Sequence, residues 1–498
     1  MHPVLQLLSG FRPFVMIALW LWLFAFQQIA AQERYGLSVS NFSGINGVHF
    51  NPTASVNSKV YLDVNLLTAG LSVENNFVFY HNNDFRFINL LKRSPLLPSA
   101  EVRGEGLDYT TQHDKVSGFY QSEIIGPSFS MHVGRQAFGI FTRGLINTNF
   151  QNVPNDLAVL FFEGIAYEPL IGADITGEDL NAAALAWTEV GLNWSYLFKK
   201  DYLNNWSFGI NVKRLSGHSG AYVAAEDLHL NIVNKDTIDF INLRADVGYS
   251  LPLDYNTNEF TGTDPLFRGK GTAIDLGFSF VRNLDVSANQ RYNRQCEASF
   301  QPYRYKIGAS VSNLGRIAFD QNAKEHSYYN VSQLWQSIDT MEYSNVNDLM
   351  AQFSTVFYGD PQASLKDSNN MKIHLPAKIN LHADYQYFPN WYLSGAIIFP
   401  LKLGDFQVRN PANAIVGVRY ETDNVEFNFS GSFYDFQKLH LGFYARYKFL
   451  SVGTDKFGIL LGASDVYGAD IYVSLKFHLR KGYCYSDKPF RDCGRFQF

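Results

Sequence analysis

Charged residues are scarce in this chain. They make up 17% of its 498 residues, against about 25% in an average soluble protein. The net charge is -5 and no basic stripe is present, so the composition argues against a nucleic-acid partner. Aromatic residues, by contrast, reach 16%. Little charge with abundant Tyr and Phe is typical of a surface that meets lipid.

Long apolar runs are also missing. Beyond the N-terminus no run of 18 apolar residues occurs, which excludes a protein built from transmembrane helices. One shorter run extends from Phe14 to Phe26, after Arg12 and before a pair of alanines. It predicts a secretory signal peptide over residues 1–31, cleaved near Ala31. The alternative is an uncleaved membrane anchor.

Cysteine is rare. Cys296 stands alone, whereas Cys484 and Cys493 lie close together in a polar C-terminal stretch. Export to an oxidising compartment favours a disulfide between Cys484 and Cys493, and two free thiols are the alternative. No His or Cys partner lies near them at ligand spacing, so the sequence predicts no metal site and no cofactor.

Alternation of apolar and polar residues is what the sequence has in abundance. In "KINLHADYQY", from Lys378 to Tyr387, the apolar positions alternate with polar ones almost without error. Successive side chains of a strand point to opposite faces, so this is a strand with one apolar and one polar face. The same pattern recurs over residues 60–67, 273–280, 425–433, 439–449 and 470–480.

The apolar face carries no charge in any of these segments. Several are close to the roughly 9–11 residues that a tilted strand needs to cross a bilayer. Very short turns such as "FPN" before Trp391 join some of them, as in outer-membrane barrels. We therefore predict an all-β fold, a transmembrane antiparallel β-barrel of about 14 strands over residues 58–480. A soluble sandwich is the alternative.

Long extramembrane loops are expected where the alternation stops, over residues 81–121, 152–183 and 320–372. Helical periodicity predicts helices inside the last two, in "VPNDLAVLFFEGI", "VSQLWQSIDTMEY" and "NVNDLMAQFSTVF". Such helices can cap a pore or form a partner surface, and a loop folded on itself is the simpler interpretation. Residues 481–498 are not strand-like and are predicted to form a periplasmic tail.

Several stretches resemble a known family. "SGINGVHFNPTAS", the segment from Ile125 to Arg143, "LPAKINLHADYQY" and "YGADIYVSLKF" are similar to outer-membrane proteins of Bacteroidota that carry a domain of unknown function. More distantly, "FNPTAS" resembles the Asn-Pro-Ala stretch that begins barrels of the long-chain fatty-acid channel type. That superfamily includes hydrophobic-substrate channels and a closed-pore shuttle protein of type IX secretion.

The second resemblance implies a plug. In such barrels the N-terminal segment lies inside the lumen, which here corresponds to residues 32–57, with Asn51 and Pro52 at the matching motif. This chain has Thr53 where the motif has Ala. Nothing in the segment identifies a fatty-acid site.

No nucleophile motif is convincing. "GHSGA" places Ser219 beside His218 but lacks the last Gly and the strand-to-helix context of a nucleophile elbow, so no catalytic residue is predicted. His382 and Asp384 share one polar face about 7 Å apart, which predicts a hydrated side-chain network, with a lumen proton relay or acid–base pair as the alternative. The polar faces supply the candidate lumen residues Asp275, Lys378, His382, Asp384, Glu426, Arg446, Lys448, Asp470, Lys476 and Arg480.

These candidate charges have mixed signs. A single-sign lining would indicate ion selectivity, whereas mixed signs indicate charge pairs across a narrow or plugged lumen. The first functional hypothesis is an outer-membrane barrel of a Gram-negative bacterium with a structural or partner-binding role in envelope assembly, secretion or surface organisation. Its partners would be outer-membrane lipid and other envelope or secretion proteins. The alternative is a transporter for a small or hydrophobic ligand through the plugged lumen; the ligand is unknown, and no enzyme is predicted.

Overall fold

The computed structural model describes residues 34–81, 107–261, 265–285, 292–293, 299–366, 370–436, 438–460 and 465–479. The predicted signal peptide, the predicted tail, all three cysteines and Arg480 lie outside this part of the chain.

Strands dominate the described residues. Helical segments are α3 (Tyr35–Val39), η1 (Gly44–His49), α4 (Ala54–Asn57), α5 (Asn155–Glu163), η3 (Glu168–Leu170), η5 (Ile338–Thr340), α6 (Val346–Tyr358) and α7 (Phe457–Leu460). The strands are β1 (Leu62–Asn75), β2 (Val78–Tyr80), β3 (Leu107–Tyr109), β4 (Lys115–Ile125), β5 (Ser128–Val133), β6 (Gln136–Pro154), β7 (Asp174–Lys200), β8 (Asn204–Ile232), β9 (Ile238–Ser250), β10 (Gly269–Asn283), β11 (Tyr292–Asn293), β12 (Ser299–Phe300), β13 (Tyr303–Phe319), β14 (Ala323–Trp335), β15 (Met371–His374), β16 (Lys378–Phe388), β17 (Trp391–Pro400), β18 (Asn413–Glu421), β19 (Val425–Tyr434), β20 (Lys438–Tyr447), β21 (Leu450–Thr454) and β22 (Gly468–Leu479).

The strands close into an antiparallel barrel of 14 strands, as the sequence predicts. β1 pairs with β22 on one side and with β4 and β5, which together act as one strand, on the other. Beyond β8 the barrel continues directly to β10 and β13. Within the described residues, no helix is long and apolar enough to cross a membrane.

The alternation of the sequence becomes the two faces of the barrel. On β10, Ile274 and Phe278 are 42% and 41% exposed on the outer face, whereas Asp275 and Ser279 are 0% and 1% exposed inside. The same holds on β16, where Leu381 faces outward and Asn380 is fully buried. An apolar outer face with a polar interior is the arrangement of a membrane barrel rather than of a soluble sandwich.

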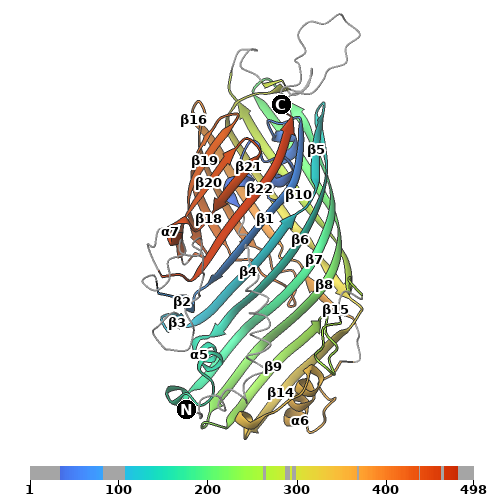
Figure 1. Ribbon diagram of the computed structural model, residues 1–498, viewed down its shortest axis with the longest axis vertical. Coiled ribbons are helices and arrows are strands. Elements are labelled where there is room, and N and C mark those ends of the chain that lie inside the picture. The colour runs from blue at the N-terminus through green and yellow to red at the C-terminus, as the bar shows by residue number, and fades with distance from the viewer. Residues whose placement is uncertain are drawn as a thin grey trace, which may run out of the picture.

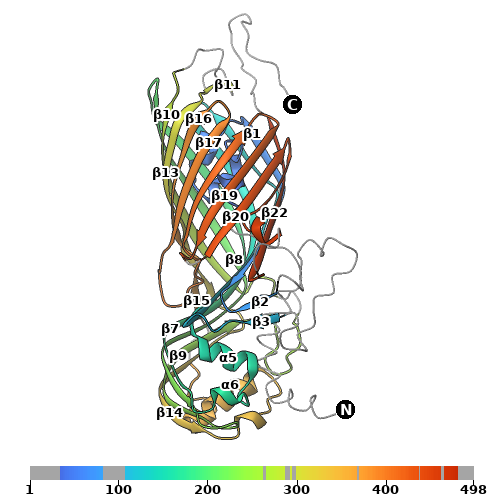
Figure 2. The ribbon, with the colours of Figure 1, turned by 90° about the vertical axis from the view of Figure 1, so that its left-hand side faces the viewer.

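One side of the barrel extends into a tall sheet. β7 and β8 have 27 and 29 residues, and the part of β8 beyond Gly217 pairs with β9 instead of β10. β9 in turn pairs with β14. We call this extension, residues 174–186 and 218–232 with β9 and β14, the wall; Figures 1 and 2 show it projecting from one end of the barrel.

Helices α5 and α6 stabilise the wall. Leu157 and Leu160 of α5 belong to a buried cluster with Leu228 and Ile238 of the wall strands. On α6, the rings of Phe353 and Phe357 stand edge-on to a wall tryptophan at 5.1 and 5.6 Å. Both helices therefore anchor to the wall and complete its core.

The predicted loops differ from the structure in three places. Residues 115–121 belong to β4, residues 174–183 belong to β7, and residues 323–335 form β14. The predictions of α5 and α6 are confirmed. The predicted helix in "VSQLWQSIDTMEY" is wrong, because its first residues continue β14, where Trp335 pairs with Ile238 of β9.

Candidate functional site

The N-terminal segment lies inside the barrel. α3, η1 and α4 are the blue coils of Figures 1 and 2. They lie within the ring of strands near the end of the barrel where β1 begins and β22 ends, which we call the terminal end. Nearly every residue from Arg34 to Ser58 is buried. We call residues 34–58 the plug.

Barrel side chains satisfy the backbone of the plug. The plug has little regular structure, so its buried carbonyl groups need partners from outside. Lys476 Nζ donates to the carbonyls of Phe42 and Ser43 at 2.7 and 2.5 Å. Asn211 Nδ2 donates to Val48 O at 2.9 Å, and Asn380 Nδ2 donates to Phe50 O at the same distance. These bonds come from widely separated strands, so the plug is held from several sides of the lumen.

The Asn51–Pro52 turn rests on glycines. A Cβ atom built at Gly209 would lie 2.6 Å from the carbonyl carbon of Pro52, and one at Gly277 would lie 2.7 Å from Pro52 Cδ. Asn193 Nδ2 donates to Pro52 O at 3.0 Å. Since real Cβ contacts are not that short, only glycine at these strand positions leaves room for the turn. Both residues of the sequence motif therefore contact the inner face of the barrel strands.

Arg419 is the centre of a buried charge cluster. It is fully buried on β18, and its guanidinium lies 2.6 Å from Asp384 and 3.3 Å from Glu421. It also donates to the carbonyl of Val39 in the plug, and its charge lies 4.7 Å from the ring centre of Tyr392. One arginine thus joins two barrel carboxylates to the plug. Asp384 accepts a further hydrogen bond from a tyrosine hydroxyl.

Further charged side chains of the barrel contact the plug. Arg34 bonds Glu123 at 2.8 Å, and Glu123 also meets Arg143 at 2.5 Å. Lys476 pairs with Asp63 at 3.0 Å, and the same carboxylate accepts from the Ile45 N–H. The lumen charges are thus compensated by neighbours of opposite sign, the arrangement that mixed signs in the sequence predict.

The other predicted lumen residues lie inside the barrel with partners of their own. Asp275 bonds Lys213 at 2.8 Å. Glu426 bonds Arg446 at 3.0 Å and accepts from a plug serine at 2.7 Å. Asp470 accepts from Thr454 Oγ1 at 2.8 Å.

Lys378 and His382 are on the same inner face of β16. Lys378 is buried at the start of the strand, and the imidazole ring of His382 lies 5.3 Å from the ring of Phe50 in the plug. The prediction for Lys448 is wrong. It lies in the exposed turn between β20 and β21 with a left-handed φ of 51°, because the chain reverses there before the alternation can continue.

Sequence reasoning missed Arg419, although a signal was present. In "AIVGVRYE", Val416 and Val418 point outward, so Gly417, Arg419 and Glu421 had to point inward. "GHSGA" lies within the continuous strand β8, where no strand-to-helix turn exists. Among the described residues, no group of three or more His, Cys, Asp or Glu side chains could hold a metal ion.

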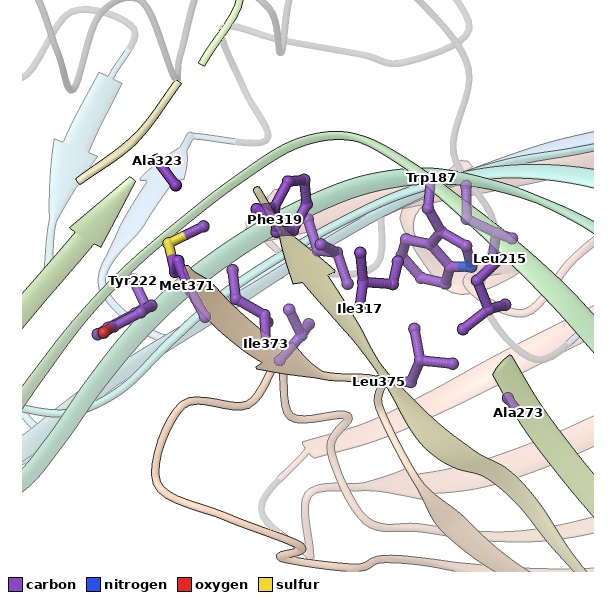
Figure 3. Packing of buried hydrophobic residues seen from close by; sticks show 14 residues of the cluster. Trp187, Leu215, Tyr222, Ala273, Ile317, Phe319, Ala323, Met371, Ile373 and Leu375 are labelled. Atoms are coloured by element: carbon purple, nitrogen blue, oxygen red, sulfur yellow. The ribbon is translucent and has the colours of Figure 1, made fainter. Parts of the chain in front are cut away.

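A second layer narrows the lumen at the wall end. Trp187, Phe319, Met371 and Ile373 belong to a buried apolar cluster contributed by strands from β6 to β15, and Figure 3 shows them packed together. The loop between β17 and β18 folds onto this cluster, with Val408 fully buried in it. Between the plug and His382 the structure leaves a small cavity of about 30 Å³, which Ser279, Lys306 and Asp384 of the barrel also line.

The solved structures that are similar to this chain have low identities and low TM-scores. The toluene transporter TodX of P. putida has 9% identity over 88% of this chain and 94% of that chain, with a TM-score of 0.38. A FadL homologue of Pseudomonas aeruginosa has 11% identity over 86% and 91%, with a TM-score of 0.34. The translocator domain of the autotransporter NalP from Neisseria meningitidis has 7% identity over 84% and 88%, with a TM-score of 0.30. Scores and identities this low say nothing about ligand or activity.

No curated protein matches the chain. A family model does match it, over residues 52–455. The match begins at Pro52 of the plug and includes the strands as far as β21. The chain therefore belongs to the family described as a family of unknown function, DUF5723.

Proposed function

We propose that this protein is an integral outer-membrane barrel with a lumen closed to solutes, which acts as a scaffold that presents its wall to other envelope proteins. The hydrogen-bonded plug is the observation that carries the proposal. In a channel, a segment that fills the lumen has to be weakly held so that solutes can pass. Here the backbone and the charged side chains of the plug are both bonded to the barrel.

The lengths of the turns support an orientation. At the terminal end, β7 and β8 and also β16 and β17 are joined by short turns, at residues 201–203 and 389–390, whereas the connection from β10 to β13 is longer. At the opposite end the chain makes long excursions, including the wall and the segment between β14 and β15. Outer-membrane barrels have short periplasmic turns and long extracellular loops, so we place the wall outside the cell.

The shape of the wall supports a scaffolding role. α5 and α6 pack onto the wall strands and give it a core of its own. A loop that merely closes a hairpin needs no such core, while a partner surface has to be rigid. Exposed apolar side chains such as Ile241 and Leu334 lie on wall strands and can contribute to a contact.

A locked plug distinguishes a scaffold from a transporter. Ser55 Oγ of the plug lies 2.8 Å from Ser195 Oγ on β7, and Cys Sγ atoms would take these same positions, so the double variant S55C/S195C should form a disulfide that fixes the plug. The readout is rescue of the envelope defect of a deletion strain, with and without a reductant. The single variants S55C and S195C are the controls.

A scaffold tolerates the lock, so we expect equal rescue in oxidised and reduced cells. Rescue that appears only after reduction would mean that the plug has to move, and the transporter hypothesis would replace ours. Failure of the disulfide to form in the folded protein would contradict the seating of the plug itself.

A further inference from the structure

Four basic residues gather on the outer face of neighbouring strands. Arg214 on β8, Lys270 on β10, Arg316 on β13 and Lys372 on β15 are all exposed. We call these four residues the basic patch. They are far apart in the sequence, and the barrel alone brings them to one place.

The register of the sheet sets the size of the patch. Thr272 on β10 pairs with Arg214 on one side and Arg316 on the other. Two residues closer to the wall, Ala318 on β13 pairs with both Lys270 and Lys372. Neighbouring strands lie about 4.8 Å apart and two residues along a strand span about 7 Å, so the four Cα atoms, on four successive strands, frame an area of about 14 by 7 Å.

The patch lies at the edge of the apolar belt. Two residues closer to the terminal end, the next outward-facing row consists of Val212, Ile274 and Leu314. Val212 and Leu314 both pair with Ile274. These residues are apolar, and Val212 and Ile274 are strongly exposed. The basic patch therefore stands where acyl chains would end and lipid headgroups would begin, on the wall side.

A rigid layer supports the patch from inside. Leu215, Ile317 and Ile373 alternate with the basic residues along β8, β13 and β15 and point into the buried apolar cluster shown in Figure 3. Because these inner side chains are packed, the strand backbones that carry the basic side chains are fixed relative to one another.

The charge of the patch is largely uncompensated. Lys270 pairs with Asp320 at 3.0 Å, while Arg214, Arg316 and Lys372 make no ion pair with any other described residue. The corresponding edge of the belt on β17 to β20 is apolar, with Phe399, Val416, Phe433 and Leu439 exposed. The edge on β8 to β15 thus carries positive charge that the edge on β17 to β20 does not match.

We infer that the basic patch binds the phosphate groups of a phosphorylated glycolipid of the outer leaflet, whose acyl chains lie on the apolar row of Val212 and Ile274. Arginine forks suit phosphate oxygens, and basic clusters at a membrane boundary recognise anionic lipid headgroups. The adjoining apolar row favours a lipid over a free phosphate ion. The inference rests on the proposed membrane placement and orientation.

The test is titration of the purified, folded full-length protein with a bisphosphorylated lipid A, followed by native mass spectrometry. The variant R214Q/R316Q/K372Q removes three charges, and K199Q/K235Q/K448Q removes three exposed charges elsewhere. We expect the patch variant to bind about fivefold more weakly for each charge removed, and the control to bind as the wild type does. R214K/R316K keeps both positive charges and should bind with most of the wild-type affinity. Heat modifiability on gels verifies that each variant is folded.

Equal affinity of the patch variant and the wild type would overturn the inference. So would equal binding of dephosphorylated lipid A, which would leave only the apolar belt as the contact. If phosphatidylglycerol competes on equal terms, the assignment to a glycolipid is wrong. These outcomes are independent of the locked-plug result, because the patch variants lie outside the lumen and leave the plug unchanged.

Discussion

Gly209 on β8 and Gly277 on β10 are direct cross-strand partners, and both face Pro52 of the plug. Two facing glycines weaken a sheet locally, because neither supplies a side chain to the other. Here the space that they leave is filled by a turn from a distant part of the chain. The pair is therefore the place where the barrel is shaped to the plug.

Replacing Gly277 by valine should dislodge the plug. The new side chain would overlap Pro52, and overpacking of this kind costs about 1–3 kcal/mol. We expect a lower free energy of unfolding in urea and faster proteolysis of residues 34–58. Gly431→Val is the matched control, because nothing lies within 4 Å of a Cβ atom there. If both variants lose the same stability, the glycine pair does not hold the turn.

Removing Arg419 should destabilise the protein strongly. In Arg419→Met, Asp384 and Glu421 lose the guanidinium that joins them in a buried site. Breaking a buried ion pair in this way costs about 3–5 kcal/mol. The exposed pair of Arg244 with Glu226 provides the control, since Arg244→Gln should cost less than about 1 kcal/mol. Denaturant titration measures both, and comparable losses would contradict the central role of Arg419.

The wall should lose stability in mild acid through His326. Burial lowers the pKa of His326 to about 4 from its usual value of 6.5, and its ring nitrogens face Ser364 Oγ at 3.0 Å and Tyr249 OH at 3.4 Å. The unfolded chain takes up the proton first, so stability is full above pH 6.5 and falls as the pH drops toward 4. Each unit of pKa difference corresponds to about 1.4 kcal/mol.

Hydrogen exchange of residues 323–335 at several pH values measures this effect. The wild type should lose protection between pH 6.5 and 4, and His326→Gln should lack that component. Parallel curves for the two proteins would show that His326 does not titrate in this window.

The sequence predicts the barrel well because its signal is local. Alternation at residues such as Leu381 and Asp384 needs only a lipid outside and a polar interior, and both follow from strand geometry. The wall was harder to foresee. Trp335 fits a helical spacing with Val331, but its pairing with Ile238 across the sheet decides its conformation, and that pairing is invisible to periodicity.

The candidate site was likewise predicted only where its signal is local. Inward orientation of Asp275 and Lys476 could be read from alternation, whereas the cluster around Arg419 depends on which strands lie opposite each other in a closed ring. A plug over residues 32–57 was expected from resemblance. Its hydrogen bonds to Asn211 and Asn380 could not be expected, since they join residues more than 160 positions apart.

Conductance in planar bilayers tests the closed lumen most directly. The positive control lacks residues 34–57 and has residues 402–409 replaced by two glycines, which removes the plug and the loop that carries Val408. We predict no steady conductance from the wild type under conditions in which the control conducts. Steady ion flow through the wild-type barrel would contradict the account and would favour a transport function.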